Sequence, residues 1–136
     1  MIPKLSEASI RRHATSQSFE RGQDYYKSGS VTSLIQRGNK LSAHVEGSDF
    51  DPYRLSIDFD NGGITDAFCT CPYNFEGWCK HIIATLLTCL HQPDLIEQRP
   101  ELTKLMAPLT REQLQLVLHK LALEQPDWMD AIEQQI

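Results

Sequence analysis

The sequence predicts an α+β fold in which N-terminal helices precede an antiparallel meander of three to four strands, a buried helix and a C-terminal helical hairpin. Three patterns predict it. Aromatic residues and a glycine keep helical spacing between residues 19 and 26. Apolar and polar residues alternate from 41 to 59, as in strands with one buried face. Residues 81–90 are apolar nearly all round, which is typical of a helix covered on most sides.

The N-terminal part is expected to form two helices. A short helical piece over residues 7–13 comes first. The second helix begins at Ser16 or Ser18, because serine is a favoured N-cap residue. It ends before Gly29, which occupies the position of a C-cap glycine.

The strands follow from the switch to a period of two. They are expected over residues 31–37, 41–45, 53–59 and 64–71. Gly38-Asn39 suits a two-residue hairpin turn, and Asn61-Gly62-Gly63 suits another turn. The sheet has one apolar face, and the helix over 81–90, partnered by the one over 19–26, is expected to cover it.

The C-terminal part is expected to be a helical extension. Prolines at 93, 100 and 108 indicate a broken connector. Thr110 then starts a helix with a capping box to Gln113, and a last short helix follows Pro126. We therefore expect residues 1–92 to form the core domain and residues 93–136 to form an extension packed on it or linked to it.

Composition narrows the class of protein. A chain of 136 residues with 40% hydrophobic content can build a modest core of its own. It has no apolar run long enough to span a membrane, and its first residues lack a secretory signal pattern. We therefore expect a cytoplasmic protein, in which clustered cysteines indicate a metal site in preference to disulfides.

The main chemical signal is Cys69-Thr70-Cys71 followed by Cys79-Lys80-His81. Residues two apart in an extended chain face the same side, so the first pair suits a strand end. Inside a helix they point about 200° apart, so Cys79 must precede the helix and His81 must lie in its first turn. This predicts one structural Zn²⁺, held by Cys69, Cys71, Cys79 and His81.

Other interpretations of these four residues stay open. They are core cysteines and a surface histidine if no metal binds, and a Cys69–Cys79 disulfide would require an oxidising compartment. A catalytic zinc needs an open coordination position, which four ligands close. No nucleotide-binding loop, nucleophile elbow or His-Glu-x-x-His helix is present. We expect a binding module and not an enzyme.

The spacing C-x-C then C-x-H resembles the signature of the SWIM zinc finger. Upstream, Phe19-Glu20-Arg21-Gly22, Tyr25-Tyr26 and Val45-Glu46-Gly47-Ser48 resemble the segment that precedes the finger in bacterial members. The resemblance spans residues 15–90. It implies zinc binding, with a role in DNA binding or in protein–protein contact, and bacterial members are linked to Snf-type helicase-like ATPases. Only the four ligand positions carry over.

The charge distribution bears on the partner. The net charge is −5, but residues 1–50 carry +2 and residues 51–136 carry −7. Converging cations are needed to hold phosphates. The candidates for such a patch are Arg11, Arg12, Arg21, Lys27, Arg37, Lys40 and Arg54. Lys80 is a further candidate, although its simpler role is to offset the charge of the zinc site.

The aromatic residues between the two ligand pairs also have two possible roles, nucleic-acid binding and packing. Tyr73, Phe75 and Trp78 either stack on unpaired bases or pack over the zinc, and packing is favoured, with Trp78 buried. His13, His44 and His119 are interpreted as surface residues, and Cys89 as a core residue. The leading expectation is a DNA-binding accessory module that works with a helicase-like ATPase. The alternative is a protein-interaction module that docks through the C-terminal hairpin or the aromatic spacer.

Overall fold

The computed structural model describes residues 2–136, which divide into two compact units, a first that ends at Arg99 and a second, Pro100–Ile136. The first unit contains a five-stranded sheet in the order β4-β3-β2-β1-β5. The strands are β1 (Val31–Arg37), β2 (Lys40–Val45), β3 (Tyr53–Asp60), β4 (Gly63–Cys69) and β5 (Glu97–Gln98). The first four pair antiparallel in sequence order, as the alternation predicts, while β5 runs parallel to β1.

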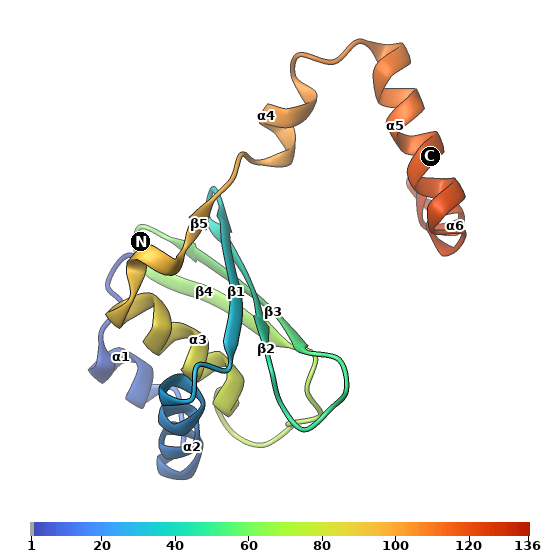
Figure 1. Ribbon diagram of the computed structural model, residues 1–136. Coiled ribbons are helices and arrows are strands. Elements are labelled where there is room, and N and C mark those ends of the chain that lie inside the picture. Colours follow the sequence, from blue (N-terminus) through green and yellow to red (C-terminus); the bar gives the residue numbers. More distant parts are fainter. Residues whose placement is uncertain (1) are drawn as a thin grey trace. The chain divides into compact units, whose positions relative to one another are not determined.

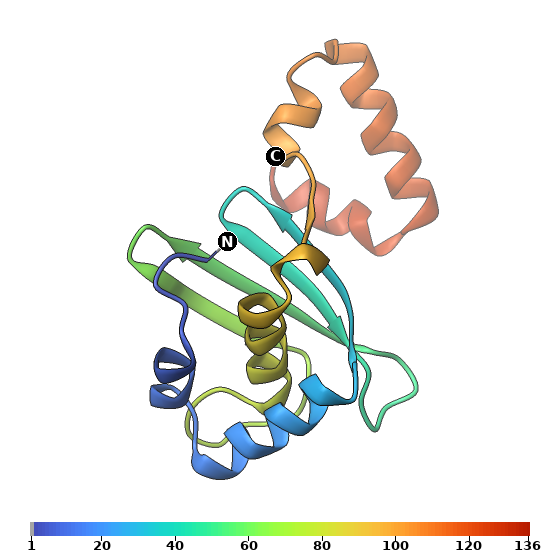
Figure 2. The same ribbon diagram turned by 60° about the vertical axis from the view of Figure 1, so that its left-hand side comes forward.

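Helices α1 (Glu7–Arg12), α2 (Ser16–Lys27) and α3 (Lys80–His91) lie on one face of this sheet (Figure 1; Figure 2). The N-cap of α2 is Thr15 and not Ser16 or Ser18, because the Thr15 side chain accepts a hydrogen bond from the Ser18 backbone N–H. The helix ends as expected, with Gly29 at a φ of 71°. The α+β fold predicted from the sequence is therefore confirmed.

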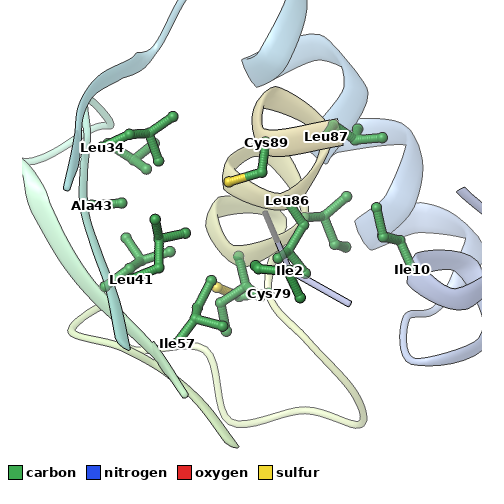
Figure 3. Packing of buried hydrophobic residues seen from close by; sticks show 14 of the residues in the cluster. Ile2, Ile10, Leu34, Leu41, Ala43, Ile57, Cys79, Leu86, Leu87 and Cys89 are labelled. Atoms are coloured by element: carbon green, nitrogen blue, oxygen red, sulfur yellow. The ribbon is translucent and has the colours of Figure 1, made fainter. Parts of the chain in front are cut away.

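The core is centred on α3, in which every residue from His81 to Cys89 is buried. Inward residues of the sheet, among them Leu41 and Ile57, point toward Leu86 and Cys89 on one side of this helix (Figure 3). On its other side α3 packs against α2 and α1. The first unit therefore has an apolar core that is complete apart from the metal ligands.

The short strand β5 was not predicted. Glu97 and Gln98 pair with Ile35 and Gln36 of β1, and the Arg99 N–H donates to the Gln36 carbonyl oxygen at 2.9 Å. These bonds tie residues 93–99, including the 3₁₀ turn η1 (Pro93–Leu95), to the first unit. The break in the chain therefore falls after Arg99, whereas the prolines had suggested a boundary after residue 92.

The second unit contains α4 (Leu102–Met106), α5 (Arg111–Glu124) and α6 (Asp127–Gln134), with α5 and α6 in contact as a hairpin. The predicted capping box is present, because Thr110 and Gln113 exchange side chain to backbone hydrogen bonds. No side chain within Pro100–Ile136 is buried. In the described part of the chain, no helix has the length and apolar character needed to cross a membrane.

Candidate metal centre

The first ligand pair lies where β4 leaves the sheet. Cys69 pairs with Leu55 of β3 as the last residue of the strand. Beyond it, the Thr70 N–H donates to the Arg54 carbonyl oxygen at 3.1 Å, and the Thr70 hydroxyl accepts from the Arg54 N–H at 3.0 Å. These bonds keep the chain extended through Thr70, so the thiols of Cys69 and Cys71 face the same side.

The second pair lies at the start of α3. Cys79 is the N-cap residue, with an extended backbone (φ −73°, ψ 165°), and His81 is in the first turn. This is the arrangement that the spacing requires, because two residues inside a helix could not share an ion at this interval. The helix N-terminus also directs its positive end toward the thiols, which favours their thiolate form.

The four donor atoms converge to within 4.8 Å of one another. The Nδ1 atom of His81 lies 3.7 Å from the Cys69 sulfur and 3.9 Å from the Cys79 sulfur. In a zinc tetrahedron with bonds of about 2.3 Å to sulfur and about 2.0 Å to nitrogen, sulfur and nitrogen are about 3.5 Å apart. The three thiols and the imidazole therefore fit a single zinc ion bound through Nδ1.

The thiols titrate as a group. A hydrogen bond from Cys69 lowers the pKa of Cys79 to about 4, against the opposing effect of burial. The same hydrogen bond, together with burial, raises the pKa of the Cys69 thiol, and burial raises that of Cys71. Zinc must displace the protons that remain on Cys69 and Cys71, so metal binding should release protons.

The other nitrogen of His81, Nε2, is buried and has no hydrogen-bond partner within residues 2–136. Two tyrosine rings flank the imidazole, Tyr53 at 4.3 Å and Tyr25 edge-on at 5.2 Å between ring centroids. Gly47 leaves room for this packing, since a Cβ there would lie 2.3 Å from the Tyr53 ring. The rings orient the ligand in place of the carboxylate or carbonyl that commonly does so. Neither the tyrosines nor Gly47 were predicted as site residues.

The segment between the ligand pairs is fixed to the α1–α2 junction. The Trp78 ring stacks on the His13 ring with 4.5 Å between centroids, and the Trp78 backbone N–H donates to the His13 carbonyl oxygen at 2.8 Å. Gly77 has a φ of 77° and approaches this carbonyl so closely that a Cβ would lie 2.6 Å from its oxygen. Trp78 is half-buried in this packing. His13 is exposed, as predicted, but its ring contacts the indole of Trp78.

Two of the predicted basic residues meet beside the metal ligands. Arg21 of α2 and Lys80 of α3 line a cavity of about 290 Å³, together with Tyr73, Phe75 and three of the metal ligands, Cys71, Cys79 and His81. No aspartate or glutamate is among the described residues that line it. The Lys80 ammonium lies 5.0 Å from the centre of the Tyr25 ring.

The remaining basic candidates are dispersed. Arg11 pairs with Glu7 at 3.1 Å, and Arg12 lines separate hollows with His13 and Trp78. Lys40 pairs with Asp58 at 3.0 Å and lies opposite Arg37 at the β1–β2 hairpin. Lys27 is in the last turn of α2, and Arg54 lies on β3. The structure therefore gathers one pair of cations near the metal ligands and not a continuous basic patch.

Residues 53–90 match the model of the SWIM zinc finger family. The chain is 28% identical over 122 residues to Zinc finger SWIM domain-containing protein 8 of Bos taurus, an alignment that covers 87% of this chain and 9% of the relative. It is 29% identical over 119 residues to the Drosophila melanogaster homolog, covering 87% of this chain and 6% of that protein. An uncharacterized protein of Methanocaldococcus jannaschii is 37% identical over 67 residues, which are 49% of this chain and 26% of that protein.

The chain thus spans less than a tenth of the length of the animal relatives. The aligned 87% of the chain is more than the first unit contains, so the similarity extends into the second unit. No solved structure matches the chain significantly. The matched segment contains all four residues of the candidate metal centre, and residues 53–90 of this chain are similar to the SWIM zinc finger.

Proposed function

We propose that this chain is a zinc-stabilised accessory module that binds nucleic acid, with its binding surface beside the metal ligands. The observation that carries the proposal is the cavity lined by Arg21 and Lys80 without any carboxylate. In a chain of net charge −5, such a site is a local exception that suits an anionic ligand. The zinc contributes by holding this surface together.

The proposal includes no catalytic step. Three cysteines and a histidine fill the four coordination positions that zinc prefers in closed structural sites. A water-activating zinc needs one of those positions to be open. We therefore assign the ion a structural role.

A second part of the proposal concerns the binding partners of the chain. We propose DNA as the nucleic acid and a Snf-type helicase-like ATPase as the larger machine, on the basis of the resemblance to bacterial SWIM proteins. Co-purification of such an ATPase with the tagged chain from its native host would support this second part. Recovery of the chain alone, under conditions that preserve nucleic-acid binding, would count against it.

Titration of the zinc-loaded chain with fluorescein-labelled DNA at two salt concentrations tests the central claim. If Arg21 and Lys80 each contact a phosphate, a rise from about 50 to 200 mM salt should weaken binding to a single strand roughly sevenfold. Arg21→Ala should reduce that salt effect to about 2.5-fold. Lys27→Ala is the matched control, because it removes the same charge from an exposed position of α2 outside the cavity.

A protein-interaction module is the second candidate. The second unit favours this function, because none of its side chains is buried and several large apolar ones are exposed. Among these are Leu116, Leu118, Trp128 and Met129. Such surfaces commonly mark protein contacts. DNA binding that is absent or insensitive to salt would leave this function as the better explanation.

A further inference from the structure

The hollow beside the metal ligands continues over α2. A second cavity, of about 330 Å³, shares Ser18, Arg21, Tyr73 and Phe75 with the first and extends to Thr15 and Gln17 at the start of that helix. None of the described residues that line it is acidic. Two adjoining hollows therefore lie beside one aromatic pair, and Arg21 borders both of them.

The aromatic pair differs in how its members are held. The Tyr73 hydroxyl donates to the Glu76 carbonyl oxygen at 2.8 Å and accepts from the Ser18 hydroxyl at 3.3 Å, which fixes the ring. Phe75 lies against it at 5.5 Å between centroids, with 77% of its surface exposed. A phenylalanine this exposed contributes little to the core, so its ring is available to a ligand.

The cations are available as well. No carboxylate within residues 2–136 pairs with Arg21, whereas Arg11, Lys40 and Arg99 each have such a partner. The Lys80 ammonium group lies over the face of Tyr25, and no carboxylate within residues 2–136 pairs with it, so its charge is shared between the thiolates of the zinc site and a ligand in the hollow. The two hollows thus combine an exposed ring with positive charge, the chemistry that holds a nucleobase and its phosphate.

We infer that these hollows bind an unpaired nucleotide of a single-stranded nucleic acid, with its base on Phe75 and the adjacent phosphates at Arg21 and Lys80. This inference rests on the proposed function and adds the form of nucleic acid to it. Bases in a duplex are stacked and paired, so their faces cannot reach a ring at the rim of a hollow. The hollow over α2, of about 330 Å³, is at the small end of ligand pockets, which suits one nucleotide at a time.

The metal positions this site. Tyr73 and Phe75 lie between the second and third zinc ligands, and Lys80 lies between the third and the fourth. Loss of zinc would free both ends of the segment that contains these rings and leave it held by its contacts with Ser18 and His13 alone. Binding of the nucleotide should therefore require the metal, even where the apolar core of the first unit persists.

The test compares fluorescein-labelled oligothymidylate with the same strand annealed to its complement, using the zinc-loaded full chain and fluorescence anisotropy. We expect the single strand to bind at least tenfold more tightly. Phe75→Ala should weaken single-strand binding about tenfold, since stacking on one aromatic ring commonly accounts for such a factor. Phe68→Ala is the matched control, an exposed phenylalanine on β4 that lines neither hollow, and it should change nothing.

Zinc stoichiometry and melting temperature, measured for both variants, establish that each is folded. Equal affinity for the duplex and the single strand would overturn the inference, as would an unchanged affinity in folded Phe75→Ala. Both results leave the proposed function intact, because nucleic acid still binds. Absence of salt-sensitive binding to either form would refute the proposed function itself.

Discussion

Gly22, in the middle of α2, sets the distance between this helix and α3. A Cβ at this position would lie 2.4 Å from Cγ2 and 2.6 Å from Cβ of Ile83, and 3.2 Å from the Lys80 carbonyl oxygen. Glycine in a helix interior is disfavoured by about 1 kcal/mol relative to alanine. An alanine here would therefore stabilise the protein if propensity decided the outcome. We predict that Gly22→Ala destabilises it instead.

The magnitude follows from the missing space. The shortest of these distances is 1.0 Å below the 3.4 Å at which ordinary contact begins. Ile83 is fully buried, so its branched side chain cannot move aside, and the two helices would have to separate. Overpacking of this kind costs about 1–3 kcal/mol, and the rigid neighbours favour the upper half of that range. After the gain in propensity, the net loss is about 1–2 kcal/mol, or about 5–15 °C in melting temperature.

Thermal unfolding followed by circular dichroism, with the zinc-loaded chain, measures this effect. Glu20→Ala is the matched control, because it changes an exposed position of the same helix and should shift the free energy of unfolding by less than about 0.5 kcal/mol. In a double mutant with Ile83→Ala, the loss should be smaller than the sum of the two single losses, since removal of Cγ2 relieves part of the clash. A higher melting temperature for Gly22→Ala would refute the close approach of α2 and α3.

Two further predictions concern the metal and its loop. Cys79→Ser, or chelation under reducing conditions, should abolish stoichiometric zinc binding and lower the melting temperature, while most of the far-ultraviolet circular dichroism persists. Unfolding of the whole chain would contradict an apolar core that is stable without the metal. Gly77→Ala should lower the free energy of unfolding by about 1–2 kcal/mol, because of the positive φ at this position and because the added Cβ would clash with the His13 carbonyl oxygen. It should also change Trp78 fluorescence. An unchanged emission spectrum in that variant would argue against the contact between Trp78 and His13.

The sequence predicted what local patterns encode. Alternation located the strands, and the spacing of the cysteines and His81 required Cys79 to be an N-cap residue, which it is. The strand β5 could not be predicted in this way, because two residues carry no periodic signal and pair through backbone groups alone. The role of Gly22 was hidden for a related reason. Its spacing places it on a helix face, but its neighbour Ile83 is 61 positions away in the chain.

The residues that surround the metal ligands could not be predicted either, because they are also far apart in the sequence. His81 lies against Tyr25 of α2 and Tyr53 of β3, which only the packing of three elements brings together. His13 was interpreted as an isolated surface residue, because its partner Trp78 lies in a different loop. Long-range pairs of this kind depend on how the helices dock on the sheet, and a single sequence records the identity of each residue but not its neighbour.

The position of the zinc separates the apolar core of the first unit from the proposed binding surface. The core of sheet and α3 is apolar and is built from residues such as Ile57 and Leu86, none of which needs the metal for its contacts. The ion instead joins the end of β4 to the start of α3, and the segment between these points presents Tyr73 and Phe75. Removal of the metal therefore acts most strongly on the aromatic rings and on Lys80, and least on the sheet. For this reason the proposed nucleic-acid binding should be lost on chelation while the strand signal persists, and simultaneous loss of both would mean that the zinc supports the core directly.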